Sequence, residues 1–132
     1  MTADIRSHSL WLDQYPGSLD ARPPLESDLQ VDVAIVGGGF TGLWTAYYLS
    51  ELDPTMRICV LEREVCGFGA SGRNGGWAVG ELSGSLEKYA KQSSMDAAVR
   101  QLRAVFDSVD EIGRVTAKEN IECGYAKGGT IR

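Results

Sequence analysis

Residues 37–42, with the sequence GGGFTG, match the pattern G-x-G-x-x-G. Each glycine has a physical task in such a turn: Gly37 permits the tight turn, Gly39 lets a pyrophosphate touch the backbone, and Gly42 lets the following helix pack on the preceding strand. A helix that begins near Thr41 would offer free N–H groups and its positive dipole end to phosphates. The turn therefore predicts binding of the pyrophosphate of a dinucleotide.

An acidic residue, Glu62, follows the next apolar run along the chain. A carboxylate at that place can accept hydrogen bonds from both ribose hydroxyls of an adenosine and would repel a 2′-phosphate, which disfavours NADP. A structural turn with a solvated glutamate is the alternative interpretation. The context favours the ligand, because the glycine motif has a strand before it, a helix after it and the acid at the next strand end.

The elements that must hold these residues are predicted from periodicity. Residues 31–36 form a β-branched apolar run typical of a buried parallel strand, residues 41–52 have helical spacing, and residues 57–61 form a second strand. Two strands joined by one helix predict a parallel, right-handed βαβ crossover and an α/β fold. Residues 33–50 carry no charge, but their glycines and their change of period argue against a membrane span.

A second glycine-rich segment, residues 67–76 with the sequence GFGASGRNGG, follows the predicted βαβ unit. Backbone amides and small side chains here suit a ligand that extends past the pyrophosphate, and so favour FAD over NAD. Two alternatives stay open: an NAD-dependent dehydrogenase that uses the same βαβ unit, and a nucleotide-binding remnant without catalysis.

The segments DVAIVGGGFTGLWTAYYL, LERE and GFGASGRNGG together resemble the FAD-dependent oxidoreductases of the D-amino-acid oxidase-like superfamily, in particular its γ-glutamylputrescine oxidoreductase-like and glycine oxidase-like branch. The resemblance covers about residues 30–132. It implies three groups of FAD-binding residues, at the pyrophosphate, at the adenosine and along the path to the flavin. In that order they are Gly37, Gly39 and Gly42 with Phe40 and Thr41; Glu62 and Arg63; and Ser71, Arg73, Asn74, Gly75 and Gly76. Arg73 could instead be a solvated loop cation, and Asn74 a turn residue that bonds its own backbone.

The resemblance also implies an activity. The parent enzyme would oxidise the C–N bond of an amine or amino acid to an imine, with the electrons passed to oxygen or another acceptor. No catalytic base is found in residues 1–132, and members of the family are longer than this chain. We therefore interpret the sequence as an N-terminal fragment with an incomplete fold.

Three regions are expected along the chain: an irregular leader arm over 1–30, the N-terminal part of an FAD-binding domain over 31–120, and the start of a substrate domain over 121–132. Residues 94–118 have the spacing of one long amphipathic helix, which Ser93 or Ser94 could cap. Residues 124–132 are predicted to form a strand, a turn and the start of an antiparallel partner.

Composition limits the partners. The net charge of −5 argues against nucleic acid and anionic membranes. The partner that the resemblance implies is a small amine or amino acid, and the oligomeric state stays open. Three cysteines without a CxxC pair argue against a zinc site or a disulfide framework, so no metal is expected. Because the first residues have no apolar signal region, we expect a cytoplasmic location.

Overall fold

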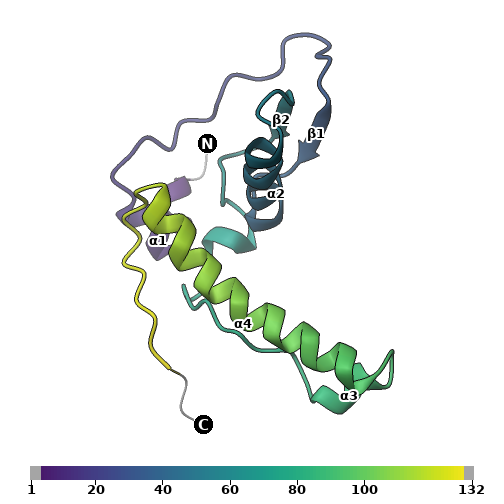
Figure 1. The fold of residues 1–132 in the computed structure, drawn as a ribbon. Coiled ribbons are helices and arrows are strands. Elements are labelled where there is room, and N and C mark those ends of the chain that lie inside the picture. The colour runs from purple at the N-terminus through teal and green to yellow at the C-terminus, as the bar shows by residue number, and fades with distance from the viewer. Residues whose placement is uncertain (1–3, 130–132) are drawn as a thin grey trace. The chain divides into compact units, whose positions relative to one another are not determined.

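The computed structural model describes residues 4–129 of the chain. These residues belong to two compact units, Met1–Gly75 and Gly76–Arg132. Figure 1 gives the order of the elements along the chain.

The first unit contains the two strands and the helix that the sequence predicts. Strand β1 (Val33–Val36) pairs in parallel with β2 (Ile58–Leu61), with Val33 opposite Ile58 and Val36 opposite Leu61. Helix α2 (Phe40–Leu52) connects them and begins one residue earlier than expected. The parallel α/β arrangement is therefore confirmed as a small two-stranded sheet, while the hand of the crossover stays a prediction.

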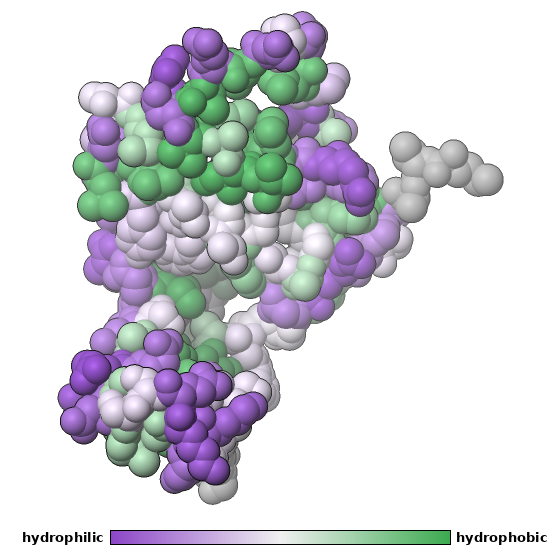
Figure 2. Space-filling view, turned by 90° about the vertical axis from the view of Figure 1, so that its right-hand side faces the viewer, coloured by the Kyte–Doolittle hydropathy of each residue, from purple (hydrophilic) through white to green (hydrophobic). Residues whose placement is uncertain are grey.

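Helix α2 covers one face of this sheet. Val33 and Ile35 are half-buried, and the Ile35 side chain lies close to Gly42 of α2, whereas the alternate residues Ala34 and Val36 are exposed, Val36 by 88%. Figure 2 shows hydrophobic residues gathered over this part of the molecule. The described residues thus supply only one layer of the two that a parallel sheet needs.

The leader is more regular than the sequence analysis expected. It forms a 3-10 helix, η1 (Ile5–His8), and a short helix, α1 (Leu10–Gln14), before an extended stretch. Asp4 and Ser9 cap these helices with their side chains, and Leu12 is buried. The prediction of an irregular leader is wrong for residues 5–14, because capping side chains stabilise turns that the hydrophobic pattern does not reveal. We call residues 4–17 the N-terminal arm.

The second unit is helical. A short helix, α3 (Leu86–Ala90), which the sequence analysis did not predict, precedes the long α4 (Met95–Lys118), and Ser94 caps α4 by accepting a hydrogen bond from the Ala97 amide at 3.1 Å. The predicted long helix is confirmed. None of the helices within residues 4–129 is both long and apolar enough to cross a membrane.

The tail after α4 departs from the prediction. Residues 121–129 contain no strand, and residues 130–132 of the predicted hairpin lie outside the described residues. The tail instead contacts α4: the Tyr125 hydroxyl donates to the Val109 carbonyl at 2.8 Å, and the Tyr125 ring lies against Gly113. A strand needs a partner to satisfy its backbone groups, and the described part of the chain provides none here.

Candidate functional site

The first glycine turn has the backbone conformation that its sequence requires. Gly37 has φ of 102°, a region that L side chains rarely adopt, and its amide donates to the Leu61 carbonyl at 2.8 Å. A Cβ at Gly42 would lie 2.1 Å from the Gly37 carbonyl oxygen and 3.1 Å from Cγ2 of Ile35. Gly42 therefore lets α2 press directly against the end of β1, as predicted.

The N-terminus of α2 presents free hydrogen-bond donors. Gly39 is the N-cap and brings no side chain to the helix end. Among residues 4–129, no hydrogen-bond acceptor is found for the amides of Gly39, Thr41 and Gly42. Unpaired amides at a helix N-terminus, with no Cβ to screen Gly39, form a surface suited to a pyrophosphate.

Ser71 lies at this helix end. Its Oγ accepts a hydrogen bond from the Phe40 amide at 2.9 Å, and a Cβ on Gly39 would lie 2.9 Å from the same oxygen. The resemblance had assigned Ser71 to the flavin path, and the structure brings it to the phosphate end of the predicted site. Sequence reasoning missed this contact, since it joins residues 31 positions apart.

Glu62 points back into the glycine turn. Its Oε2 accepts from the Gly38 amide at 2.7 Å, and its Oε1 accepts from the Glu64 amide at 3.0 Å. The Glu64 and Gly38 amides, in that order of effect, hold the pKa of the Glu62 carboxyl below its usual value. Glu62 is thus ionised and fixed beside the turn, the place that a ribose-binding acid requires.

The side chains of three other predicted site residues, Arg63, Arg73 and Asn74, bond to neighbours within their own segments. Arg63 is 86% exposed and pairs with Glu64. Arg73 donates from Nε to the Phe68 carbonyl at 2.8 Å, and its guanidinium lies 5.1 Å from the centre of the Phe68 ring. Asn74 donates to the Ser71 carbonyl at 2.7 Å, which fits the alternative of a turn residue. Arg73 is therefore more ordered than a solvated loop cation.

Gly75 and Gly76 end the second glycine segment. Both are exposed, and only Gly76 has a positive φ, of 75°. The division between the two compact units falls between them.

The second glycine segment contains a turn that sequence reasoning did not recognise. Gly67 has φ of 79°, and a Cβ at Gly72 would lie 2.1 Å from the Gly67 carbonyl oxygen. A three-residue 3-10 helix, η2 (Ala70–Gly72), follows, and the Gly67 amide donates to the Gly38 carbonyl at 2.9 Å. The signal was present in the sequence, because residues 67–72, GFGASG, also match G-x-G-x-x-G.

Within residues 4–129, no group of histidine, cysteine or carboxylate side chains is arranged to hold a metal ion. Cys59, Cys66 and Cys123 are free thiols. The chemistry on offer in the described site is therefore hydrogen bonding from backbone amides, one fixed carboxylate and nearby cations.

Comparison with known proteins adds a family to this geometry. Residues 32–132 match the model of the DAO family, described as FAD dependent oxidoreductase. The chain is 36% identical over 106 residues to the probable oxidoreductase OrdL of Haemophilus influenzae and 37% identical over 105 residues to γ-glutamylputrescine oxidoreductase of Escherichia coli. Each alignment covers 80% of this chain and 24% of the relative.

A shorter match extends the comparison. Sarcosine oxidase subunit beta of Rhizobium meliloti is 51% identical over 43 residues, which is 33% of this chain and 10% of the relative. No solved structure matches the chain significantly. The chain thus spans about a quarter of the length of the first two relatives.

Proposed function

The chain belongs to the DAO family of FAD-dependent oxidoreductases, and from this premise we propose that residues 37–42, Glu62 and Ser71 bind the ADP half of FAD. The observation that carries the proposal is the helix end of α2, where the amides of Gly39, Thr41 and Gly42 lack a partner among residues 4–129. Free amide donors gathered at a helix N-terminus are what a pyrophosphate needs.

Each group of this site has a task toward the cofactor. The free amides and the dipole of α2 hold the phosphate charge, a term of about 0.3–1 kcal/mol where exposed and up to about 2 where partly buried. Glu62 would accept hydrogen bonds from the ribose hydroxyls and repel a 2′-phosphate. Arg63 would contact the adenosine, while Arg73, Asn74, Gly75 and Gly76 would line the path toward the flavin. FAD itself, when bound, supplies the capacity to accept a hydride from the substrate.

The names of the relatives support a substrate class. The names of two of them, γ-glutamylputrescine oxidoreductase and sarcosine oxidase subunit beta, specify an amine and an amino acid respectively. We propose that the whole protein oxidises the C–N bond of a small amine or amino acid to an imine, with electrons passed to oxygen or another acceptor. For the 132-residue chain by itself we expect weak FAD binding, self-association through the uncovered sheet face, and no turnover.

A ligand series tests the binding proposal. We expect the purified chain to bind FAD and ADP and to bind NADP much more weakly, measured by flavin fluorescence and by competition. Glu62→Gln should weaken FAD at least about tenfold, because hydrogen bonds to a charged acceptor contribute about 1.5–3 kcal/mol each.

The matched control is Glu64→Gln. Among residues 4–129 the Glu64 side chain pairs with the exposed Arg63 alone. The hydrogen bond that Glu64 donates to Glu62 comes from its backbone amide and is retained in the variant. This variant should bind FAD like the wild type. Equal FAD affinity in Glu62→Gln and wild type, or a preference for NAD over FAD, would contradict the proposal and favour the dehydrogenase alternative.

A further inference from the structure

The N-terminal arm is folded upon itself around one side chain. Arg6 donates from Nη1 to the carbonyls of Leu12 at 3.2 Å and Tyr15 at 2.7 Å, and from Nη2 to the carbonyl of Gly17 at 2.9 Å. Carbonyls at the end of a helix lack partners within the helix, and here the Arg6 guanidinium bonds carbonyls in the last turn of α1 and just after it. The arm is therefore a preformed element rather than a loose end.

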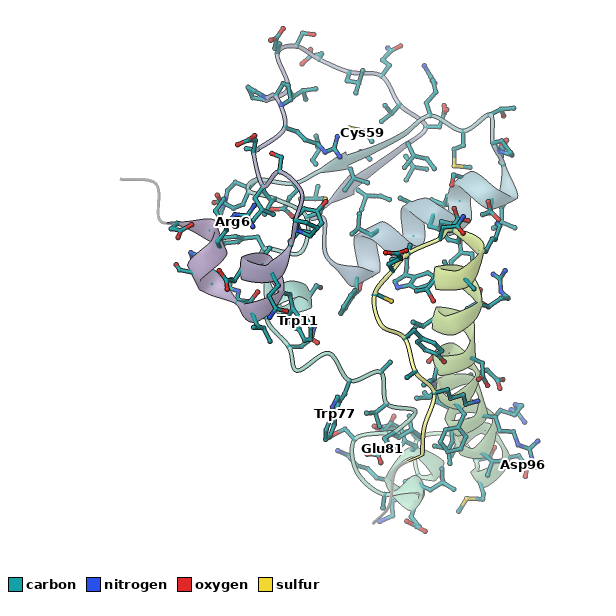
Figure 3. The ribbon with its side chains drawn as sticks, turned by 90° about the vertical axis from the view of Figure 1, so that its left-hand side faces the viewer. Arg6, Trp11, Cys59, Trp77, Glu81 and Asp96 are labelled. Atoms are coloured by element: carbon teal, nitrogen blue, oxygen red, sulfur yellow. The ribbon has the colours of Figure 1, made fainter. Side chains whose placement is uncertain are left out.

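The arm reaches the second glycine segment at two points within the first unit. The Trp11 indole Nε1 donates to the Asn74 carbonyl at 2.7 Å, across 63 residues of sequence, and the His8 ring lies 5.1 Å from the ring of Phe68. Figure 3 shows Trp11 and Arg6 on the arm. Residues 20–30, which lead from the arm to β1, are exposed throughout, whereas the arm itself makes these contacts with the second glycine segment.

Ordering residues 67–76, the segment that the arm contacts, loses much conformational entropy. Five of the ten residues from 67 to 76 are glycines, and glycine loses more conformational freedom on ordering than any other residue. The two contact points, Phe68 and Asn74, lie on either side of Ser71, whose Oγ bonds the Phe40 amide at the start of α2. Fixing both flanks of Ser71 fixes the segment that must meet the cofactor.

We propose that the N-terminal arm is a clamp that holds residues 67–76 ready for the cofactor, with Trp11 and His8 as positioning residues. The inference rests on the proposed function for its ligand, and on the arm's contacts for its geometry. Its physical basis is preorganisation. A loop that is already ordered loses little conformational entropy when the ligand binds, so the ligand binds more tightly.

Trp11→Phe is the first test, since it removes the indole N–H and keeps an aromatic ring. We expect faster amide hydrogen exchange in residues 67–76, with exchange in α2 and β2 unchanged. FAD affinity should fall about threefold to tenfold, the value of one hydrogen bond. ADP affinity should fall less, because within this segment ADP would meet Ser71 alone, whereas FAD would also meet residues 73–76. Arg6→Gln, which loosens the arm without touching residues 67–76, should act in the same direction.

Trp77→Phe is the matched control, the same change at a tryptophan that is 88% exposed; it should leave exchange and affinity at wild-type values. The clamp is overturned if Trp11→Phe leaves exchange in residues 67–76 unchanged, or if FAD and ADP weaken equally, which would indicate a general loss of stability. A wild-type chain that binds neither ligand overturns the proposed function instead, and the exchange comparison still decides whether the arm orders the segment.

Discussion

The turns at residues 37–42 and 67–72 share their local geometry. Each begins with a glycine of positive φ, Gly37 or Gly67, and ends five residues later with a glycine whose Cα lies against the carbonyl of the first. Their surroundings differ: the first turn joins β1 to the 13-residue α2, whereas the second follows an irregular stretch and continues into a three-residue 3-10 helix.

The glycine pattern specifies the local turn, and the flanking residues decide what the turn is joined to. The pattern specifies the turn in both places. Only the first turn has a strand that fixes its start and a helix long enough to add a useful dipole and a row of free amides. Ser71 of the second turn bonds the Phe40 amide of the first turn, so both turns contribute to the same predicted site.

A methyl group added at the closing glycine of each turn should have the largest effect on stability. Gly42→Ala should lower the free energy of unfolding by about 1–3 kcal/mol through overpacking against backbone, despite a gain of up to about 1 kcal/mol in helix propensity. Gly72→Ala meets the same 2.1 Å approach but sits in a three-residue helix, so its loss of stability should be smaller. Urea unfolding followed by circular dichroism measures both.

Gly75→Ala is the control for this pair, because nothing lies within 4 Å of a Cβ at that position. It should unfold at the wild-type midpoint. A wild-type midpoint for Gly42→Ala would show that α2 can move away from β1 at no cost, and the account of the first turn would be wrong.

A smaller effect separates two serines that cap helices, one in the second turn and one before α4. Ser71 caps α2 from a distant segment, and Ser94 caps α4 from within its own helix, by bonds of 2.9 Å and 3.1 Å. Replacing either by alanine should cost about 0.5–2 kcal/mol of helix stability. Only Ser71→Ala should also weaken FAD binding, several-fold, since only Ser71 lies at the predicted phosphate site. If Ser94→Ala weakens FAD equally, the cap at Ser71 has no special relation to the ligand.

The parts of the fold that the sequence predicted are those whose causes are local. The strand at 33–36, the turn and the helix at 40–52 follow from neighbouring residues, and so does α4 with its cap at Ser94. The prediction of a strand after residue 123 was wrong within the described residues. A strand depends on a partner that its own sequence does not contain.

In the candidate site, too, residues related by a local spacing were predicted and contacts between distant segments were not. Glu62 was found because a fixed spacing relates it to the glycine turn, and its contact with the Gly38 amide agrees with that reasoning. The contacts of Ser71 with Phe40 and of Trp11 with Asn74 join residues 31 and 63 positions apart. No spacing rule covers such contacts, since they depend on how separate segments pack.

An ion pair lies just before the two strands, at the end of the sheet opposite to the first glycine turn. Asp32 precedes β1 and Arg57 precedes β2, and their side chains form two hydrogen bonds, at 2.9 and 3.1 Å, while Asp32 also accepts from the Arg57 amide. These bonds to Arg57 lower the pKa of Asp32 to about 2. Because the folded-state pKa lies below the unfolded value of about 3.9, the pair stabilises the fold fully above about pH 4 and loses this contribution as the pH falls toward 2.

Asp32→Asn should therefore flatten the dependence of unfolding free energy on pH between about 4 and 2, with little change in FAD affinity, because ligands bind at the carboxyl ends of parallel strands. The effect should be modest and shrink in high salt, since both side chains are largely exposed. Asp28→Asn, the same change in the exposed stretch before β1, should keep the wild-type slope. If Asp32→Asn weakened FAD as strongly as Ser71→Ala, the two ends of the sheet would be coupled. The assignment of ligand binding to the end of the sheet that carries the first glycine turn would then fail.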